Sequence, residues 1–262
     1  MELNGKTALL TGGVGGIGKC IARSLLENGA SVVLFDLCKE KGEEFTQQLQ
    51  TEYGKGRVHF VAGDVTKKED LERAFKETLE KFSYLDIMLN NAGIGLEEKW
   101  EDMININWVA LVRGTNEALK VMSKSAGGKG GVIVNTASIA GMMAYMKGPV
   151  YAGTKAAVIG FTRSHGGPQE FEKTGVRFAA ICPNLTDTDL LGGPTGLGLT
   201  EYLKQMQSTG DAKYIPQKPE NVATAVIHLI KEAPNGSIWV VEHEEPAYQL
   251  QMPHHKEMKM SR

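Results

Sequence analysis

The fold follows from the stretch Thr7-Ala8-Leu9-Leu10-Thr11-Gly12-Gly13-Val14-Gly15-Gly16-Ile17-Gly18. It joins a strand-length apolar run to a cluster of glycines, and a helical pattern follows directly. Glycines lack the Cβ atoms that would obstruct a pyrophosphate, and a helix N-terminus offers unpaired N–H groups to an anion. The stretch therefore predicts a phosphate-binding turn at Gly12, Gly16, Ile17 and Gly18. A tight strand-to-helix turn without a ligand is the simpler alternative.

An acidic residue ends the next apolar run, residues 31–36. Asp36 stands eighteen residues after Gly18, the separation at which an acid contacts the ribose of a dinucleotide. A carboxylate accepts hydrogen bonds from the ribose hydroxyls of NAD and repels the 2′-phosphate of NADP. The neighbouring Leu37 and Cys38 are uncharged, and the glycine turn holds no basic residue. The sequence predicts NAD as the cofactor.

Short apolar or β-branched runs alternate with longer helical patterns up to residue 241, which is typical of a parallel sheet with helices on both faces. We expect strands at 6–11, 31–36, 57–62, 85–89, 131–137, 176–182 and 237–241. We expect helices at 16–28, 40–53, 67–82, 101–123, 150–165 and 219–232. The fold class is α/β, a single Rossmann-type doubly wound sheet of about seven strands. Residues 1–244 are expected to form one dinucleotide-binding catalytic domain.

Three stretches depart from this alternation. Residues 187–214 carry five glycines around an amphipathic segment and follow the sixth strand, at the carboxyl edge of the sheet where ligands bind. We expect a substrate lid there, with a long connection as the alternative. Residues 245–262 lack periodicity and are expected to form a flexible tail. Ser164-His165-Gly166-Gly167-Pro168 interrupts a helical pattern, so the helix should stop, kink or loop out.

Composition excludes several classes of protein. The chain has 262 residues, 42% of them hydrophobic, which is enough to bury a large core. Its net charge of -2 gives no general attraction to nucleic acid or anionic lipid. Cys20, Cys38 and Cys182 form no C-x-x-C pair, so the sequence predicts neither a disulfide framework nor a metal site. Because the sequence shows no signal-peptide pattern and no apolar run of membrane length, we expect a soluble cytoplasmic protein with no membrane partner.

Tyr151 and Lys155 lie four residues apart in an apparently helical segment. On a helix that spacing puts both side chains on one face. A free Tyr titrates near 10, and an adjacent positive charge lowers its pKa toward the range of a general acid/base. The spacing alone is weak, because Tyr214 and Lys218 also match it, although Pro216 between them forbids a regular helix. We expect Tyr151 to exchange the substrate proton and Lys155 to tune it.

Together the motifs resemble those of the short-chain dehydrogenase/reductase family over residues 4–241. They stand in the family's order, namely the glycine turn, Asp64-Val65, Asn90-Asn91-Ala92-Gly93, Asn107, Ser138, Tyr151 and Lys155. Within the family the chain is similar to the NAD-dependent 15-hydroxyprostaglandin dehydrogenases and the zinc-free insect alcohol dehydrogenases. That closer likeness is carried by Val150-Tyr151-Ala152-Gly153-Thr154-Lys155, Ile181-Cys182-Pro183 and Asn235-Gly236-Ser237-Ile238-Trp239.

The resemblance implies an oxidoreductase that transfers a hydride between NAD and a lipid-like or small secondary alcohol, or the matching ketone. Ser138 would stabilise the substrate oxygen, Tyr151 would exchange the proton, Lys155 would hold the nicotinamide ribose, and Asn107 would hold a water of a proton relay. Asp64 and Val65 would flank the adenine, Asn91 with Ala92 and Gly93 would cover the nicotinamide side, and Pro183 and Thr188 would complete the cofactor site. The resemblance also implies a homodimer.

Each residue has a simpler role as an alternative. A Ser that ends a strand is often a cap, Asn107 is able to stabilise its own helix, and Asp64 is able to initiate the helix that follows it. Two other functions also stay open. One is a catalytically impaired NAD(H)-binding sensor or scaffold. The other is an NADP-dependent carbonyl reductase, which the carboxylate of Asp36 disfavours.

Overall fold

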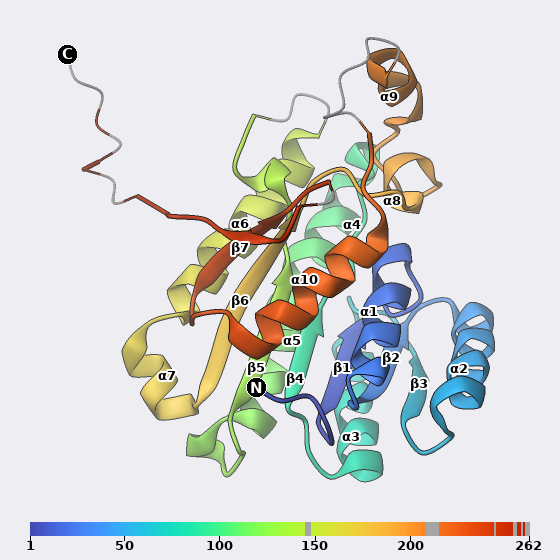
Figure 1. Cartoon of the computed structure of the whole chain (residues 1–262), viewed down its shortest axis with the longest axis vertical. Helices are drawn as coiled ribbons and strands as arrows, with labels where there is room; N and C mark the ends of the chain where they lie inside the picture. The colour runs from blue at the N-terminus through green and yellow to red at the C-terminus, as the bar shows by residue number, and fades with distance from the viewer. Residues whose placement is uncertain (145–147, 208–214, 244, 254–255, 258, 260–262) are drawn as a thin grey trace.

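Eight strands form one sheet in the order β3-β2-β1-β4-β5-β6-β7-β8 in the computed structural model (Figure 1). The structure describes residues 1–144, 148–207, 215–243, 245–253, 256–257 and 259. The strands are β1 (Thr7–Thr11), β2 (Ser31–Asp36), β3 (Val58–Ala62), β4 (Ile87–Asn90), β5 (Gly131–Thr136), β6 (Val176–Pro183), β7 (Ser237–Val241) and β8 (Tyr248–Gln249). Neighbours from β3 to β7 pair in parallel, and β8 is antiparallel to β7. The α/β doubly wound fold is confirmed, with one strand more than expected.

Helices cover both faces of this sheet because its strands are apolar on both sides. The helices are α1 (Gly16–Glu27), α2 (Lys39–Tyr53), α3 (Lys68–Phe82), α4 (Trp100–Ile104), α5 (Ala110–Met122), α6 (Pro149–His165), α7 (Pro168–Thr174), α8 (Asp189–Gly192), α9 (Thr200–Gln207) and α10 (Pro219–Glu232). Along β1, Leu10 packs with residues of α1, α2 and α10, whereas Leu9 packs with residues of α3 and α5. Successive side chains along each strand therefore pack into two separate apolar layers, one on each face of the sheet.

The order of the strands reverses between β1 and β4, where successive connections leave for opposite sides of the sheet. In such folds a ligand binds outside the carboxyl ends of the strands at this switch point. Asp36, Asn90, Thr136 and Pro183 end β2, β4, β5 and β6, respectively. Parallel pairing therefore brings residues from distant parts of the chain to one edge of the sheet.

The single helix expected over residues 101–123 is divided in two. A π-helical turn at Asn105–Val109 separates α4 from α5. Within it the Asn107 side chain accepts a hydrogen bond from the Ile94 amide and donates one to the Ile94 carbonyl, both at 2.9 Å. Single π-helical turns inside helices are frequent at functional sites. The expectation of one regular helix was wrong because this contact lies thirteen residues away along the chain.

The expected helix break at residues 164–168 is confirmed. α6 ends at His165, and α7 begins with Pro168 in its first position. A Cβ atom on Gly166 would lie 2.2 Å from the Cα atom of Gly236, in the turn before β7. Gly166 is thus required for a close backbone approach, and the break joins the end of α6 to the last parallel strand of the sheet.

Part of the presumed flexible tail is ordered. Tyr248–Gln249 extends the sheet as β8, and the Leu250 amide donates to the Ile238 carbonyl at 2.8 Å. Leu250 and Met252 pack against the apolar cluster that includes Trp108 and Phe161. The sequence pattern of residues 245–262 did not predict this strand, which forms because the uncovered edge of β7 offers unpaired backbone groups. Over the part of the chain that the structure describes, every helix is too short or too polar to cross a membrane.

Candidate active site

The glycine turn after β1 is shaped by two glycines that no other residue can replace without strain. Gly12 has φ +64°, and a Cβ atom there would lie 2.9 Å from the Cα atom of Ala92. A Cβ atom on Gly18 would lie 2.1 Å from the carbonyl oxygen of Gly12. The turn therefore lies directly on the backbone after β4 and on the first turn of α1.

The N-terminus of α1 meets the requirements of a pyrophosphate site. The helix begins at Gly16 with Ile17 in its first turn, no side chain caps it, and its first turn carries no acid. Its unpaired N–H groups and the positive end of its dipole are open to an anion. A Cβ atom on Gly16 would lie 2.6 Å from Cγ2 of Thr188, so the segment after β6 lies against the turn.

Gly18→Ala is expected to remove dinucleotide binding. The added Cβ forces the carbonyl of Gly12 to move, and overpacking of this kind costs about 1–3 kcal/mol of stability. Gly160→Ala in α6 is a matched helical control, because a Cβ atom there meets nothing within 4 Å and should stabilise the helix by about 0.5–1 kcal/mol. NADH fluorescence titration and urea unfolding measure both effects. Unchanged NADH affinity in Gly18→Ala contradicts the assignment.

Asp36 is fixed beside this turn by backbone donors. Its two carboxylate oxygens accept hydrogen bonds from the amides of Val14 and Cys38, each at 3.1 Å. A carboxylate has about four lone-pair sites. It therefore keeps acceptor capacity for hydroxyl groups outside the protein while its charge stays next to the glycine turn.

Asn91 and Thr11 bind the glycine turn to the end of β4. The Asn91 amide nitrogen Nδ2 donates to the carbonyls of Thr11 at 3.1 Å and Gly12 at 3.2 Å. The Thr11 hydroxyl accepts from the amides of Asn91 at 3.0 Å and Ala92 at 3.1 Å. Asn91 thus fixes the backbone beside the expected nicotinamide site. Thr11 supports the same contact, and no pattern in the sequence marked it.

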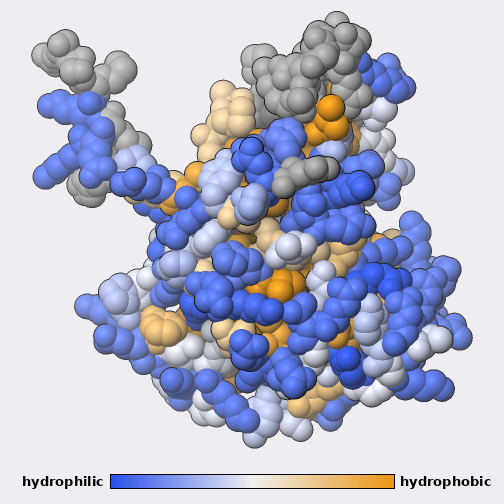
Figure 2. Space-filling model, viewed as in Figure 1, coloured by the Kyte–Doolittle hydropathy of each residue, from blue (hydrophilic) through white to orange (hydrophobic). Residues whose placement is uncertain are grey.

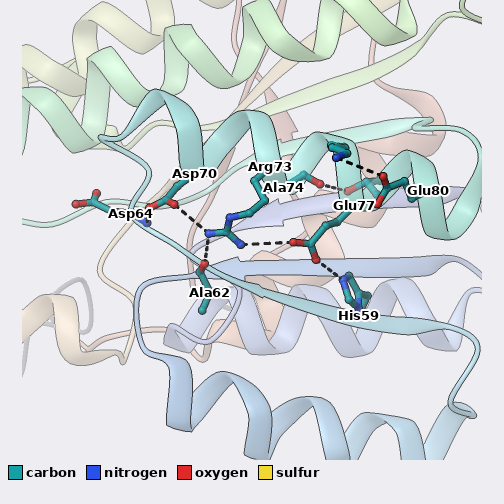
Figure 3. Close-up of polar contacts among 10 residues, drawn as sticks. His59, Ala62, Asp64, Asp70, Arg73, Ala74, Glu77 and Glu80 are labelled. Atoms are coloured by element: carbon teal, nitrogen blue, oxygen red, sulfur yellow. Dashed lines mark hydrogen bonds and ion pairs between the residues drawn. The ribbon is translucent and has the colours of Figure 1, made fainter.

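The Asp64-Val65 segment follows β3 and is held by a polar network on α3 (Figure 3). The Asp64 carboxylate accepts from the amide and the hydroxyl of Thr66, at 2.9 and 2.8 Å. The Asp64 amide and the Arg73 guanidinium both donate to the Asp70 carboxylate at 3.0 Å and hold its pKa below the usual value. Asp64 therefore organises the turn before α3, whose N-cap residue is Lys67, so it does not cap that helix as the simpler alternative supposed. Val65 lies next to Thr11 and Ala92 around a cavity of about 10 Å³.

The structure brings the three expected catalytic side chains together at the ends of β5 and α6. Ser138 follows β5, is 9% exposed, and its Oγ accepts a hydrogen bond from the Ala140 amide at 3.2 Å. Ser138 is thus a cap, but a hydroxyl that accepts one bond keeps its own donor. Tyr151 and Lys155 are each 4% exposed, one turn apart on α6. The Lys155 Nζ atom lies 5.6 Å from the centroid of the Tyr151 ring.

Burial changes the electrostatics of Lys155. It lowers the pKa of the ammonium from 10.5 to about 8, although the neighbouring Cys182 thiol acts in the opposite direction. The same burial raises the pKa of Cys182 to about 12, so that thiol stays neutral. The Lys155 ammonium donates to the Thr136 carbonyl at 2.9 Å. At neutral pH Lys155 is still a cation, now in a poorly solvated place where its charge acts strongly on a nearby phenol.

Asn107 is a buried neighbour of Lys155. It is 1% exposed, and beyond its bonds to Ile94 its Nδ2 donates to the Thr154 hydroxyl at 3.2 Å. A Cβ atom on Gly93 would lie 3.2 Å from Asn107 Oδ1 and 3.5 Å from Lys155 Nζ. A larger residue at position 93 would therefore crowd both Asn107 and Lys155. The Asn107 side chain thus links the loop after β4 to Thr154 on α6.

Apolar residues of the expected lid pack near Tyr151. Leu190 and Leu197, with Ile94 and Val150, pack against the buried cluster of Met103, Ala140 and Tyr151. The Gly95 amide donates to the Thr195 carbonyl at 2.9 Å, which joins the loop after β4 to the lid. Pro183 ends β6, and the segment after it leads through Thr188 into α8. Tyr214 of the second Tyr/Lys match lies outside the described residues.

A further residue of the site is Glu97, whose carboxylate accepts hydrogen bonds from the backbone of α6. No local pattern in the sequence marks it, because its partners lie more than fifty residues later. Among the residues that the structure describes, no group of three or more His, Cys, Asp or Glu side chains is arranged to hold a metal ion.

Several known proteins are similar to this chain in sequence or fold. The family model described as short chain dehydrogenase matches residues 6–197. The 15-hydroxyprostaglandin dehydrogenase [NAD(+)] of Mus musculus is 38% identical over 91% of this chain and 90% of its own length. Alcohol dehydrogenase 2 of Ceratitis cosyra is 34% identical, and 92% of each chain is covered. A short chain dehydrogenase from Burkholderia cenocepacia, solved in complex with NADP, has a TM-score of 0.78 and 25% identity over 92% of this chain and 98% of its own. The chain therefore belongs to the short-chain dehydrogenase family of oxidoreductases.

Proposed function

We propose that this protein is an NAD-dependent dehydrogenase that oxidises apolar secondary alcohols to ketones, with Tyr151 as the general acid/base. The observation that carries the proposal is the buried Tyr151/Lys155 pair beside Ser138, at the edge of the sheet that also holds the glycine turn and Asp36. The dehydrogenase relatives that act on hydroxyprostaglandins and alcohols support the reaction class.

The glycine turn, the uncapped N-terminus of α1 and Asp36 fit the pyrophosphate and adenosine ribose of a dinucleotide. Lys155 would hold the nicotinamide ribose, and Asn91 and Thr188 would lie beside the nicotinamide end. When bound, the nicotinamide supplies the acceptor for the hydride that leaves the carbinol carbon.

Proton transfer is the task of the chain's own residues. The Ser138 hydroxyl donates a hydrogen bond to the substrate oxygen and stabilises its developing negative charge. Tyr151 takes the hydroxyl proton, and the Lys155 ammonium favours the tyrosinate that makes this possible. Asn107 holds the loop after β4 against Thr154, which keeps the Lys155 environment in place. For the next turnover the Lys155 ammonium would give up one proton and take up the proton of Tyr151, which restores the tyrosinate.

The substrate pocket favours apolar molecules. Leu190, Leu197, Ile94 and Val150 pack against the buried cluster that contains Tyr151. Beyond them, Met142, Met143 and Ile215 are 37%, 58% and 56% exposed. Figure 2 shows hydrophobic residues at the surface of the upper end of the molecule, where α8 and α9 lie, above a mostly hydrophilic body. Apolar side chains of the expected lid beside Tyr151 suit an uncharged alkyl chain.

A series of 2-alkanols with NAD tests the substrate class. Each added methylene contributes about 0.8 kcal/mol when buried, so kcat/KM should rise roughly fourfold per carbon until the pocket is filled. Short hydroxy acids such as lactate serve as the charged comparison and should be poor substrates. A flat series, or a preference for lactate, contradicts the apolar pocket.

An NADP-dependent carbonyl reductase is the second candidate, because the similar structure from Burkholderia cenocepacia was solved with NADP. The carboxylate of Asp36 argues against it for this chain, since it would face the 2′-phosphate. Tighter binding of NADP than of NAD by the wild-type protein would support this alternative.

Asp36→Asn is expected to relax the choice of cofactor. The variant keeps one acceptor for Val14 or Cys38 but loses the charge that repels the phosphate. Loss of a charged hydrogen bond costs about 1.5–3 kcal/mol, so the ratio of kcat/KM for NAD over NADP should fall by roughly 10-fold to 100-fold. Glu40→Gln, an exposed acid at the start of α2, is the control. An unchanged ratio in Asp36→Asn refutes the assignment.

A further inference from the structure

Glu97 caps the catalytic helix from a distance. It lies in a 3-10 turn, Glu97–Lys99, after β4. Its Oε1 accepts a hydrogen bond from the amide of Tyr151 at 2.8 Å, and its Oε2 accepts one from the amide of Val150 at 3.3 Å. Charged acceptors on backbone N–H groups form stronger bonds than neutral ones. The amide that Glu97 holds most closely therefore belongs to the proposed general acid/base itself.

α6 has no cap of its own. It begins after Gly148, no side chain next to it in the sequence caps it, and its first turn contains no acid. The first N–H groups of a helix have no partner inside the helix, and its N-terminus carries about half a positive charge. Glu97 both satisfies two of these donors and neutralises that charge, within the turn that carries Tyr151.

The segment that carries Glu97, residues 94–97, also joins the other parts of the site. Ile94 is bonded to Asn107, and Gly95 is bonded to Thr195 of the lid. A Cβ atom on Gly95 would lie 2.7 Å from the Leu197 side chain, so the lid lies directly on the segment. One short segment thus contacts Asn107, the expected lid and the start of α6.

We propose that Glu97 is a positioning residue of the reaction, which holds Tyr151 against the substrate oxygen and sets the charge at the start of α6. The proposal rests on the proposed function of Tyr151. It assigns to Glu97 a role that acts through the backbone and through charge, without contact with the substrate.

The charge of Glu97 affects the balance between the neutral phenol and the tyrosinate of Tyr151 in a defined direction. Removing it leaves the positive end of α6 unopposed and favours the tyrosinate. Among the residues that the structure describes, the other buried ionisable groups of this region are Lys155 on α6 and the neutral Cys182 thiol on β6. Glu101 and Asp102 on α4, Glu98 in the same turn and Asp189 on α8 are exposed, where solvent screens their charges.

Glu97→Gln tests the proposal, with Glu98→Gln as the matched control one residue away. Glu97→Gln should lower kcat roughly tenfold while the KM for NAD stays within about twofold, because one charged hydrogen bond to the helix is lost. The acidic limb of its pH–rate profile should move by about half a pH unit toward lower pH. Glu98→Gln should match the wild type in kcat and in pH profile.

The titration of Tyr151 can also be followed without turnover. Tyrosinate absorbance is measured as the difference between each protein and the same protein carrying Tyr151→Phe. The midpoint for Glu97→Gln should lie below that of the wild type. If Glu97→Gln keeps the wild-type kcat, the proposal is overturned. It is also overturned if the midpoint is unchanged in both the pH–rate profile and the absorbance titration. An inactive wild type instead contradicts the proposed function, and the absorbance titration then decides on Glu97 alone.

Discussion

Tyr151→Phe should lower kcat by roughly 10³-fold, within the range of 10²-fold to 10⁴-fold that general acid/base groups contribute. The substitution removes the phenolic oxygen that exchanges the proton and leaves the ring among Leu190, Leu197, Ile94 and Val150. NADH affinity should stay within about twofold, because the glycine turn and Asp36 are untouched. Steady-state kinetics and NADH fluorescence titration measure the two effects separately.

Tyr84→Phe is the control for this substitution. Tyr84 is 50% exposed, far from the carboxyl edge of the sheet, so loss of its hydroxyl should leave kcat unchanged. If Tyr151→Phe keeps the full rate with every alcohol that the wild type oxidises, Tyr151 is not the general acid/base.

Lys155→Met should lower activity and raise stability together. The fall in the pKa of Lys155 from 10.5 to about 8 corresponds to about 3 kcal/mol of burial cost at neutral pH. Met keeps the alkyl stem and removes the charge, while loss of the bond to the Thr136 carbonyl costs about 1 kcal/mol. We expect a net gain of about 2 kcal/mol in the free energy of unfolding at pH 7, with kcat lower by at least about 10²-fold.

The gain should depend on pH in a defined direction. Below pH 8 Lys155 is protonated in both the folded and the unfolded protein, so the wild type carries the full burial cost. Between about 8 and 10.5 the folded protein loses this proton before the unfolded chain does, and the wild type becomes more stable relative to Lys155→Met. Above 10.5 the lysine is neutral in both states, and the cost of the charge disappears.

Urea unfolding of both proteins at pH 7 and pH 10 measures this difference directly. Lys76→Met, whose side chain is 74% exposed, should change stability by only a few tenths of a kcal/mol. A Lys155→Met protein that is less stable than the wild type at pH 7 would show that the ammonium contributes net stability through its bonds. In that case burial of the Lys155 charge would not lower the stability of the wild type.

Local signals were enough to predict the sheet and the positions of Asp36 and Ser138 at the ends of its strands. Glycines after an apolar run mark the turn after β1 because Gly12 and Gly18 leave no room for a Cβ atom. Asp36 and Ser138 each follow an apolar run, and parallel pairing carries such positions to one edge of the sheet. The break at Gly166 was predictable because two glycines and a proline oppose a helix wherever they stand.

Long-range contacts account for what the sequence did not reveal. The π-helical turn at Asn107 depends on Ile94, and the cap of α6 depends on Glu97. β8 depends on the free edge of β7, which no pattern within residues 245–262 announces. Thr11 resembles any other strand residue until the loop after β4 is placed against it. Each of these features depends on a partner outside its own helix, strand or turn, so the pattern within that element does not reveal it.

The central claim is that a hydride passes from the carbinol carbon of an apolar secondary alcohol to NAD at the Tyr151/Lys155 site. The most direct measurement is transfer of deuterium from a 2-alkanol deuterated at the carbinol carbon, read by the mass of the reduced cofactor. The account predicts one deuterium per reduced NAD with the wild type and roughly 10³-fold slower labelling with Tyr151→Phe. Tight NADH binding with no label transferred from any alcohol in the series would contradict it and would favour a binding protein without catalysis.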